Sequence, residues 1–158
     1  MVQGEPTRVS SQGFNTELYL RESRDMAQAY GDEAGKVMTH LSTLFGAPPH
    51  ASLAVVETEA GTPNGYAAPG IVFLSPKAIG KQVNPRLLAN QLSRQWFGVM
   101  ISPATRNHAW IQNGAARYSE LLYLEHLNGP GALESEVRDS YIEALTLENI
   151  PVIQDARL

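Results

Sequence analysis

The chain has 158 residues, of which 43% are hydrophobic, so it can bury one core but is too short for two ordinary domains. Its net charge is −4 and its basic residues form no run, which argues against nucleic acid as a partner. The absence of cysteine excludes disulfides and thiolate metal sites and leaves the compartment open. No apolar stretch approaches the roughly 20 residues that span a bilayer, so we expect no membrane insertion by this segment.

The N-terminal residues 1–15 are polar and interrupted by Gly4, Pro6 and Gly13. We therefore expect a tail or linker there, with one short strand around residues 7–10, followed by a single domain over residues 16–158. A helix is predicted over residues 18–45, because apolar side chains recur at three- and four-residue steps. These side chains are Met26, Tyr30, Ala34, Val37, Leu41 and Leu44.

The middle of the chain alternates between strand and turn signals. Residues 52–57 form a β-branched, apolar run that predicts a strand, and residues 70–75 predict a second one. The Pro/Gly/Asn-rich segment 61–70 between them predicts a loop.

Three further helices are expected in the remainder. The first covers residues 84–101, with Asn84 as N-cap and Pro85 in the first turn. The second begins near His108 or Trp110 and reaches about Leu127. The third covers residues 133–147, with its apolar side chains directed inward: Val137, Tyr141, Ala144 and Leu145.

Residues 90–98 carry the most informative motif, Asn-Gln-Leu-Ser-Arg-Gln-Trp-Phe-Gly. A His-Glu-x-x-His zinc helix needs imidazoles at positions i and i+4, and these positions hold Asn90 and Arg94. The general base beside the first ligand is replaced by Gln91, whose neutral amide cannot accept a proton from water. A guanidinium remains protonated and repels a cation.

The flanking residues make this segment resemble the signature helix of M1-type aminopeptidases, which are gluzincin metallopeptidases. Gln95-Trp96-Phe97-Gly98 is similar to the end of that helix, and the third zinc ligand of the family follows eighteen residues after the second histidine. That position is Asn113 here. It lies in the segment Trp110-Ile111-Gln112-Asn113-Gly114-Ala115-Ala116-Arg117-Tyr118-Ser119-Glu120, which resembles the family's Trp-Leu-Asn-Glu-Gly-Phe-Ala-x-Tyr-x-Glu.

Two upstream segments extend the resemblance to about residues 40–128. Phe45-Gly46-Ala47-Pro48-Pro49 is similar to the entry into the family's catalytic sheet. Alignment on Gly70-Ile71 places Ala67 at the glutamate of the family's Gly-x-Met-Glu-Asn loop, which holds the substrate's amino group. The resemblance thus implies an α+β fold, a thermolysin-like upper subdomain with a small mixed sheet packed on several helices. It further implies that the strand at residues 70–75 is the sheet edge beside the substrate cleft. It also implies a chain several-fold shorter than the family's enzymes, and hence a piece of a longer protein.

The resemblance suggests a partner for the cation at the second histidine position. Glu120 matches a family glutamate that supports a zinc histidine, so we expect it to pair with Arg94. The four histidines have no four-residue spacing between them and predict no new metal site. Glu57 and Glu59 near the predicted cleft can serve as an acid/base pair, although a solvated role is the commoner one.

The resulting hypothesis is a catalytically inactive, M1 aminopeptidase-like domain with no zinc or other cofactor. We expect such a domain to have a structural role, to interact with the remainder of its own parent chain, or to bind an extended peptide or a protein beside the strand at residues 70–75. The alternatives are a degenerate copy within an active zinc aminopeptidase and an unrelated chemistry in the old cleft.

Overall fold

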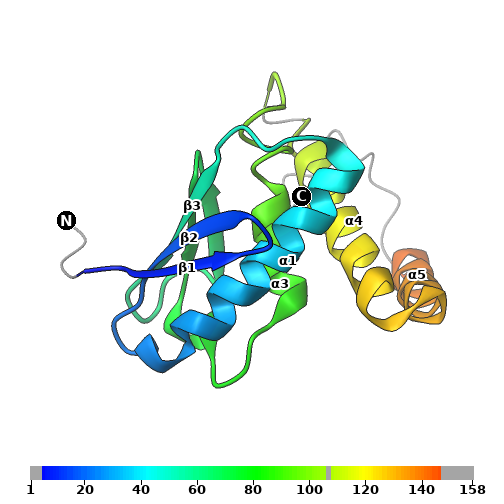
Figure 1. The fold of residues 1–158 in the computed structure, drawn as a ribbon. Helices are drawn as coiled ribbons and strands as arrows, with labels where there is room; N and C mark the ends of the chain where they lie inside the picture. The colour runs from blue at the N-terminus through cyan, green and yellow to red at the C-terminus, as the bar shows by residue number, and fades with distance from the viewer. Residues whose placement is uncertain (1–4, 106–107, 147–158) are drawn as a thin grey trace.

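The computed structural model describes residues 5–105 and 108–146. Figure 1 shows the sheet at one side, α1 and α3 against it, α4 next to them, and α5 farthest from the sheet. In chain order the elements are β1 (Thr7–Ser11), β2 (Phe14–Tyr19), the 3-10 turn η1 (Arg24–Met26), α1 (Ala27–Phe45), β3 (Ser52–Glu57), β4 (Gly65–Ala68), β5 (Ile71–Leu74), α2 (Pro76–Ile79), α3 (Pro85–Ser93), α4 (Ala109–Asn128) and α5 (Pro130–Leu145).

The sheet is mixed, as predicted, with the strand order β1-β2-β3-β5-β4. The two outer pairs are antiparallel, while β2, β3 and β5 run parallel to one another. The predicted loop over residues 61–70 contains β4, which pairs with β5 and takes the sheet edge. The prediction that the strand at residues 70–75 forms this edge is therefore wrong, because Tyr66 pairs with Phe73 and Ala67 with Val72.

The prediction of a tail over residues 1–15 fails for its described part. The short strand expected at residues 7–10 is confirmed as β1, but it is part of the sheet and packs on α1. Val9 is buried against Gly31, and the backbone of Ser11 lies against Gly35. A Cβ on Gly35 would lie 2.5 Å from the Ser11 carbonyl oxygen, so only glycine permits this approach.

The helix predicted over residues 18–45 begins nine residues later, at Ala27. The preceding segment is β2, in which Thr16 and Leu18 alternate inward with the period of a strand. The turn between β2 and α1 is held by the buried carboxylate of Glu57. It accepts hydrogen bonds from the backbone N–H groups of Arg21 (2.5 Å) and Glu22 (2.9 Å), and from the hydroxyl of Ser23.

The core lies between the sheet and α1, and α3 adds to it. Within α1, the predicted apolar stripe is buried at Tyr30, Ala34, Val37 and Leu41, whereas Leu44 is exposed. Trp96 is the largest fully buried side chain, and its indole N–H donates to the carbonyl of Gly46 at 3.1 Å. This bond ties the exit of α3 to the end of α1.

The helix predicted over residues 84–101 has its expected start and an earlier end. The side chain of Asn84 accepts from the Leu87 N–H at 3.1 Å, which confirms the N-cap. After Ser93 the backbone leaves the α-helix, since the N–H groups of residues 99–101 bond to carbonyls five residues back and Gly98 has φ +147°. Arg94 is consequently the C-cap of α3 rather than an interior residue.

The two C-terminal helices are present, but their burial differs from the prediction. Helix α4 matches its expected bounds closely. Helix α5 buries no residue, so the expectation that its apolar side chains point inward is wrong: Val137, Tyr141, Ala144 and Leu145 are all exposed. No helix in the described ranges combines the length and the hydrophobicity needed to cross a membrane.

Candidate functional site: a polar cluster between α3 and α4

The polar residues of the motif lie where α3 and α4 face each other. On α3 and at its C-cap, Arg86, Asn90 and Arg94 recur every four residues and therefore share one face. On α4, Arg117 and Glu120 are three residues apart on the opposing face. The two helices contact each other extensively, which brings the polar side chains together.

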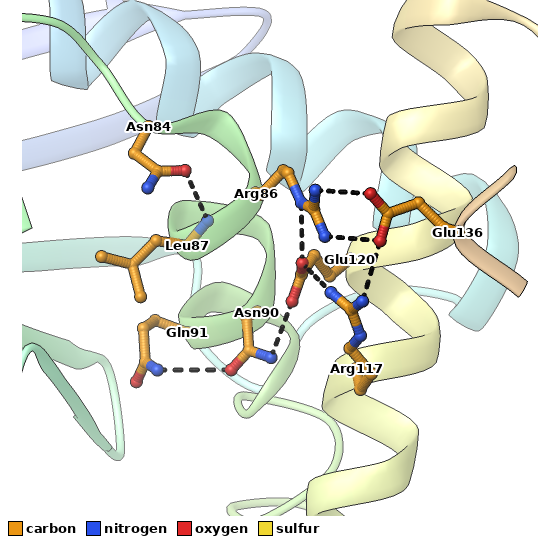
Figure 2. Close-up of polar contacts among 8 residues, drawn as sticks. All are labelled: Asn84, Arg86, Leu87, Asn90, Gln91, Arg117, Glu120 and Glu136. Carbon is orange, nitrogen blue, oxygen red and sulfur yellow. Dashed lines mark hydrogen bonds and ion pairs between the residues drawn. The ribbon is translucent and has the colours of Figure 1, made fainter. Parts of the chain in front are cut away.

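Glu120 is the centre of this cluster and is only 8% exposed. Figure 2 shows its carboxylate accepting from Arg86 Nε at 3.0 Å, from Arg117 Nη1, and from Asn90 Nδ2 at 3.2 Å. The predicted pair of Arg94 with Glu120 is thus wrong. Its cationic partners are Arg86, in the first turn of α3, and Arg117, on its own helix, and the sequence predicted neither pair.

A second carboxylate, that of Glu136, connects α5 to this cluster. It accepts from both terminal nitrogens of Arg86, at 2.8 and 2.9 Å, and from Arg117 Nη2 at 2.9 Å (Figure 2). The bonds from Arg86 lower the pKa of the Glu136 carboxyl, and the same contacts raise the pKa of Arg86. Helix α5 buries no side chain, and this charged contact ties it to both α3 and α4.

Arg94 and Asn113 form a separate pair at the other end of the interface. Arg94 Nη1 donates to the Asn113 side-chain oxygen at 3.2 Å, so the two residues that the sequence resemblance aligns with the second and third zinc ligands meet at this interface. Arg94 is half-buried, and burial lowers the pKa of its guanidinium. Among residues 5–105 and 108–146, no carboxylate lies within ion-pair distance of it.

Gln91, at the position of the general base, points away from the ion pairs and toward β4 (Figure 2). It is 7% exposed, and a Cβ on Gly65 would lie 2.6 Å from its amide carbon. Its Nε2 donates to Asn90 Oδ1 at 3.3 Å, whereas its Oε1 has no partner in the described chain. A buried carbonyl without a donor is costly, and here the cost falls on the residue that the sequence resemblance aligns with the general base.

This set of side chains does not fit a zinc ion. Zinc takes imidazole, thiolate or carboxylate ligands, and Arg94 has no lone pair to offer. The Asn90 amide is already bonded on both sides, to Gln91 and to Glu120. In the part of the chain that the structure describes, no group of three or more His, Cys, Asp or Glu residues is placed to hold a metal.

The other sequence candidates lie outside the cluster. Ala67 is on β4 and its methyl group has no means to bind an ammonium group. Glu57 caps the β2–α1 turn, and that structural role explains its burial. Trp110 and Tyr118, two residues of the α4 segment that resembles the M1 motif, are 40% and 57% exposed and lie outside the core.

Two features could not be read from spacing along the chain. Glu136 reaches the cluster only because Gly129-Pro130 turns α5 back along α4. His40 of α1 and His126 of α4 stack with their ring centroids 4.4 Å apart, although 86 positions separate them in the sequence. The four-residue recurrence of Arg86, Asn90 and Arg94 was visible in the sequence and marks the polar face of α3.

The fold is similar to that of M1 zinc metallopeptidases. The chain superposes on the M1 zinc metallopeptidase from Deinococcus radiodurans with a TM-score of 0.72 and 21% identity, covering 90% of this chain and 33% of that one. A mutant form of an M1 zinc metallopeptidase bound to the substrate Tyr-Ser-Ala, also from Deinococcus radiodurans, gives a TM-score of 0.69 at 19% identity, with the same coverage. A two-domain M1 zinc metallopeptidase mutant bound to L-tryptophan gives 0.67 at 19% identity, covering 95% and 35%.

These similarities confirm the expected α+β fold and its likeness to part of an M1 peptidase domain. No protein-family model matches the sequence. The chain spans about a third of the length of the solved structures that it matches.

Proposed function

We propose that this chain is an M1 peptidase-like domain that binds no catalytic zinc and hydrolyses no peptide. The proposal is supported by the hydrogen bonds and packing of the four residues aligned with the zinc ligands and the general base: Asn90, Gln91, Arg94 and Asn113. Arg94 donates to Asn113, Asn90 donates to Glu120, and Gln91 is buried against Gly65. The side chains bond to one another where the M1 resemblance implies ligands and a base, and none of the four can activate water.

We further propose that the domain acts as a structural or peptide-binding module, beside the remainder of a longer parent chain. Within residues 5–105 and 108–146, strand β4 is at the end of the sheet order, with β5 as its one neighbour. An edge strand can pair with an extended peptide through its free backbone groups. One of the similar solved structures, an M1 zinc metallopeptidase mutant, is bound to the substrate Tyr-Ser-Ala, which supports a peptide as the class of ligand here.

The test combines metal analysis with an activity assay on the purified chain. We expect less than stoichiometric zinc by elemental analysis after dialysis against zinc, and no hydrolysis of aminoacyl-anilide substrates. A variant that restores Asn90→His, Gln91→Glu, Arg94→His and Asn113→Glu is the matched control, and it should take up zinc. Stoichiometric zinc together with chelator-sensitive turnover in the native sequence would refute the proposal.

A further inference from the structure

The polar cluster between α3 and α4 has an unbalanced charge. Three guanidinium groups, those of Arg86, Arg94 and Arg117, lie at this interface with two carboxylates, those of Glu120 and Glu136. Both carboxylates bond to Arg86 and Arg117. The excess positive charge therefore belongs to Arg94, whose one protein bond in the described chain goes to a neutral amide.

We propose that Arg94 and Asn113 form a binding site for the carboxylate group of a ligand, a step that rests on the proposed peptide-binding role. A guanidinium has five N–H donors in a planar fork, and the Asn113 bond uses one of them. The remaining donors match the two oxygens of a carboxylate. Asn113 is exposed and Arg94 half-buried, so an incoming group can reach the fork from solvent.

The charges around Arg94 favour a monoanion. One added negative charge balances the single positive charge of Arg94, whereas a phosphate dianion would leave one negative charge in excess. Partial burial also strengthens the attraction, because a desolvated guanidinium interacts with an anion in a lower effective dielectric. The chemistry that this site recognises is thus a single carboxylate, as at the end of a peptide or on a free amino acid.

The site lies on the same helix as the residue that contacts the sheet edge. Gln91, three positions before Arg94, lies against Gly65 of β4. The proposed site requires that a peptide paired with β4 run with its carboxyl terminus toward the end of α3. In this arrangement Arg94 holds the carboxyl end of the bound peptide and takes no part in bond cleavage.

The experiment is a chemical-shift titration of the full isotope-labelled chain with three probes: N-acetyl-trialanine, its C-terminal amide, and free alanine. We expect saturable shifts at the Asn113 side-chain amide with the free acid, and binding weaker by about tenfold or more for the amide. Arg94→Gln should weaken binding of the acid by a similar factor. Arg94→Lys, which keeps the charge and loses the fork, should give an intermediate loss.

The control variant is Arg138→Gln, since Arg138 forms an exposed pair with Glu134 on α5 and should leave binding unchanged. Free alanine binding as well as the peptide acid would support the carboxylate site and assign it to amino acids. Equal binding of acid and amide would overturn the carboxylate site while leaving peptide binding intact. Absence of saturable shifts with all three probes, or full binding by Arg94→Gln, would also overturn it. Zinc content and hydrolysis test the pseudo-peptidase proposal separately.

Discussion

At the scale of single residues, Glu120 connects three donors from two helices. Its carboxylate is largely desolvated, whereas Arg86 and Arg117 keep 37% and 41% of their side chains exposed. The carboxylate therefore bears most of the burial cost, and the bonds that it accepts offset that cost. Loss of its charge would leave two cations facing one remaining carboxylate.

We expect Glu120→Gln to lower the free energy of unfolding by about 2 kcal/mol, because a buried charged pair loses one partner. Urea denaturation at neutral pH measures this change. Glu134→Gln is the matched control, since its pair with Arg138 has side chains 76% and 70% exposed, and it should change stability by less than about 0.5 kcal/mol. Equal effects of the two substitutions would contradict the central role of Glu120.

Gln91 allows a second test at this scale, because its buried Oε1 has no donor in the described chain. Gln91→Glu should lower stability by about 2 kcal/mol at pH 7, since burial opposes the charged carboxylate and raises its pKa. A raised pKa in the folded state means that the penalty shrinks as pH falls toward the unfolded value near about 4.3. Urea denaturation at pH 7 and pH 5 measures the difference, and Gln91→Leu should show no such pH dependence. A penalty that is independent of pH would refute this account.

At the scale of elements, the close packing of β1 on α1 depends on two glycines four residues apart. Because Gly31 and Gly35 have no side chains, β1 packs directly against the backbone of α1 at these two positions. Glycine within a helix is unfavourable by about 1 kcal/mol relative to alanine. That cost is offset here by the strand contact, which also buries Val9.

Gly35→Ala should therefore destabilise the protein by about 1–3 kcal/mol despite the better helix propensity of alanine, because its Cβ would collide with Ser11. Gly114→Ala on α4 is the matched control: nothing lies within 4 Å of the added Cβ, and stability should rise by about 0.5–1 kcal/mol. Thermal unfolding followed by circular dichroism measures both variants. A stabilising Gly35→Ala would show that the contact between β1 and α1 is not tight.

Local signals in the sequence were sufficient for several elements. The N-cap at Asn84, the strand Ser52–Glu57 and the bounds of α4 depend on neighbouring residues, and the structure confirms them. Other elements form only because they pair with strands elsewhere in the sheet. Residues 14–19 become a strand because β1 and β3 flank them, and β4 forms inside a Gly-rich loop because β5 pairs with it.

The candidate site was only partly predictable for the same reason. The motif spacing identified Asn90, Gln91, Arg94 and Asn113, but it did not reveal which charges neutralise each other. The sequence paired Glu120 with Arg94, whereas its cationic partners are Arg86 and Arg117, because the pairing depends on how α3 and α4 are oriented. Arg94 lies at the C-cap, where α3 has already ended, and its side chain meets Asn113.

At the scale of the whole molecule, the layers beyond the sheet are joined by different kinds of contact. Helix α1 meets the sheet through the apolar core, whereas α1 and α4 meet at the stacked rings of His40 and His126. Tyr123 lies beside both rings and donates to Glu33 at 2.8 Å. Burial, followed by the nearby charge of His126, lowers the pKa of His40.

Stability should therefore fall as the solution is acidified through about pH 6.5, the ordinary histidine value. Because the pKa of His40 is lower in the folded state, the unfolded chain binds more protons in this range, and protonation favours unfolding. Urea denaturation at pH 7.5 and pH 5.5 measures the loss, which should be smaller in His40→Gln. His50→Gln, in an exposed turn, should retain the wild-type pH dependence. An unchanged pH dependence in His40→Gln would contradict this assignment.

In the described part of the chain, a buried amide rather than an ion pair links the sheet to the segment that follows α3. Gln95, 1% exposed, donates to the Ala68 carbonyl at 3.0 Å and accepts from the Gly70 N–H at 2.9 Å. Both ends of this side chain hold the β4–β5 turn against the exit of α3. One glutamine thus fixes the spacing between the outermost strand and that helix, and any sliding of the strand along the helix would break both of its hydrogen bonds.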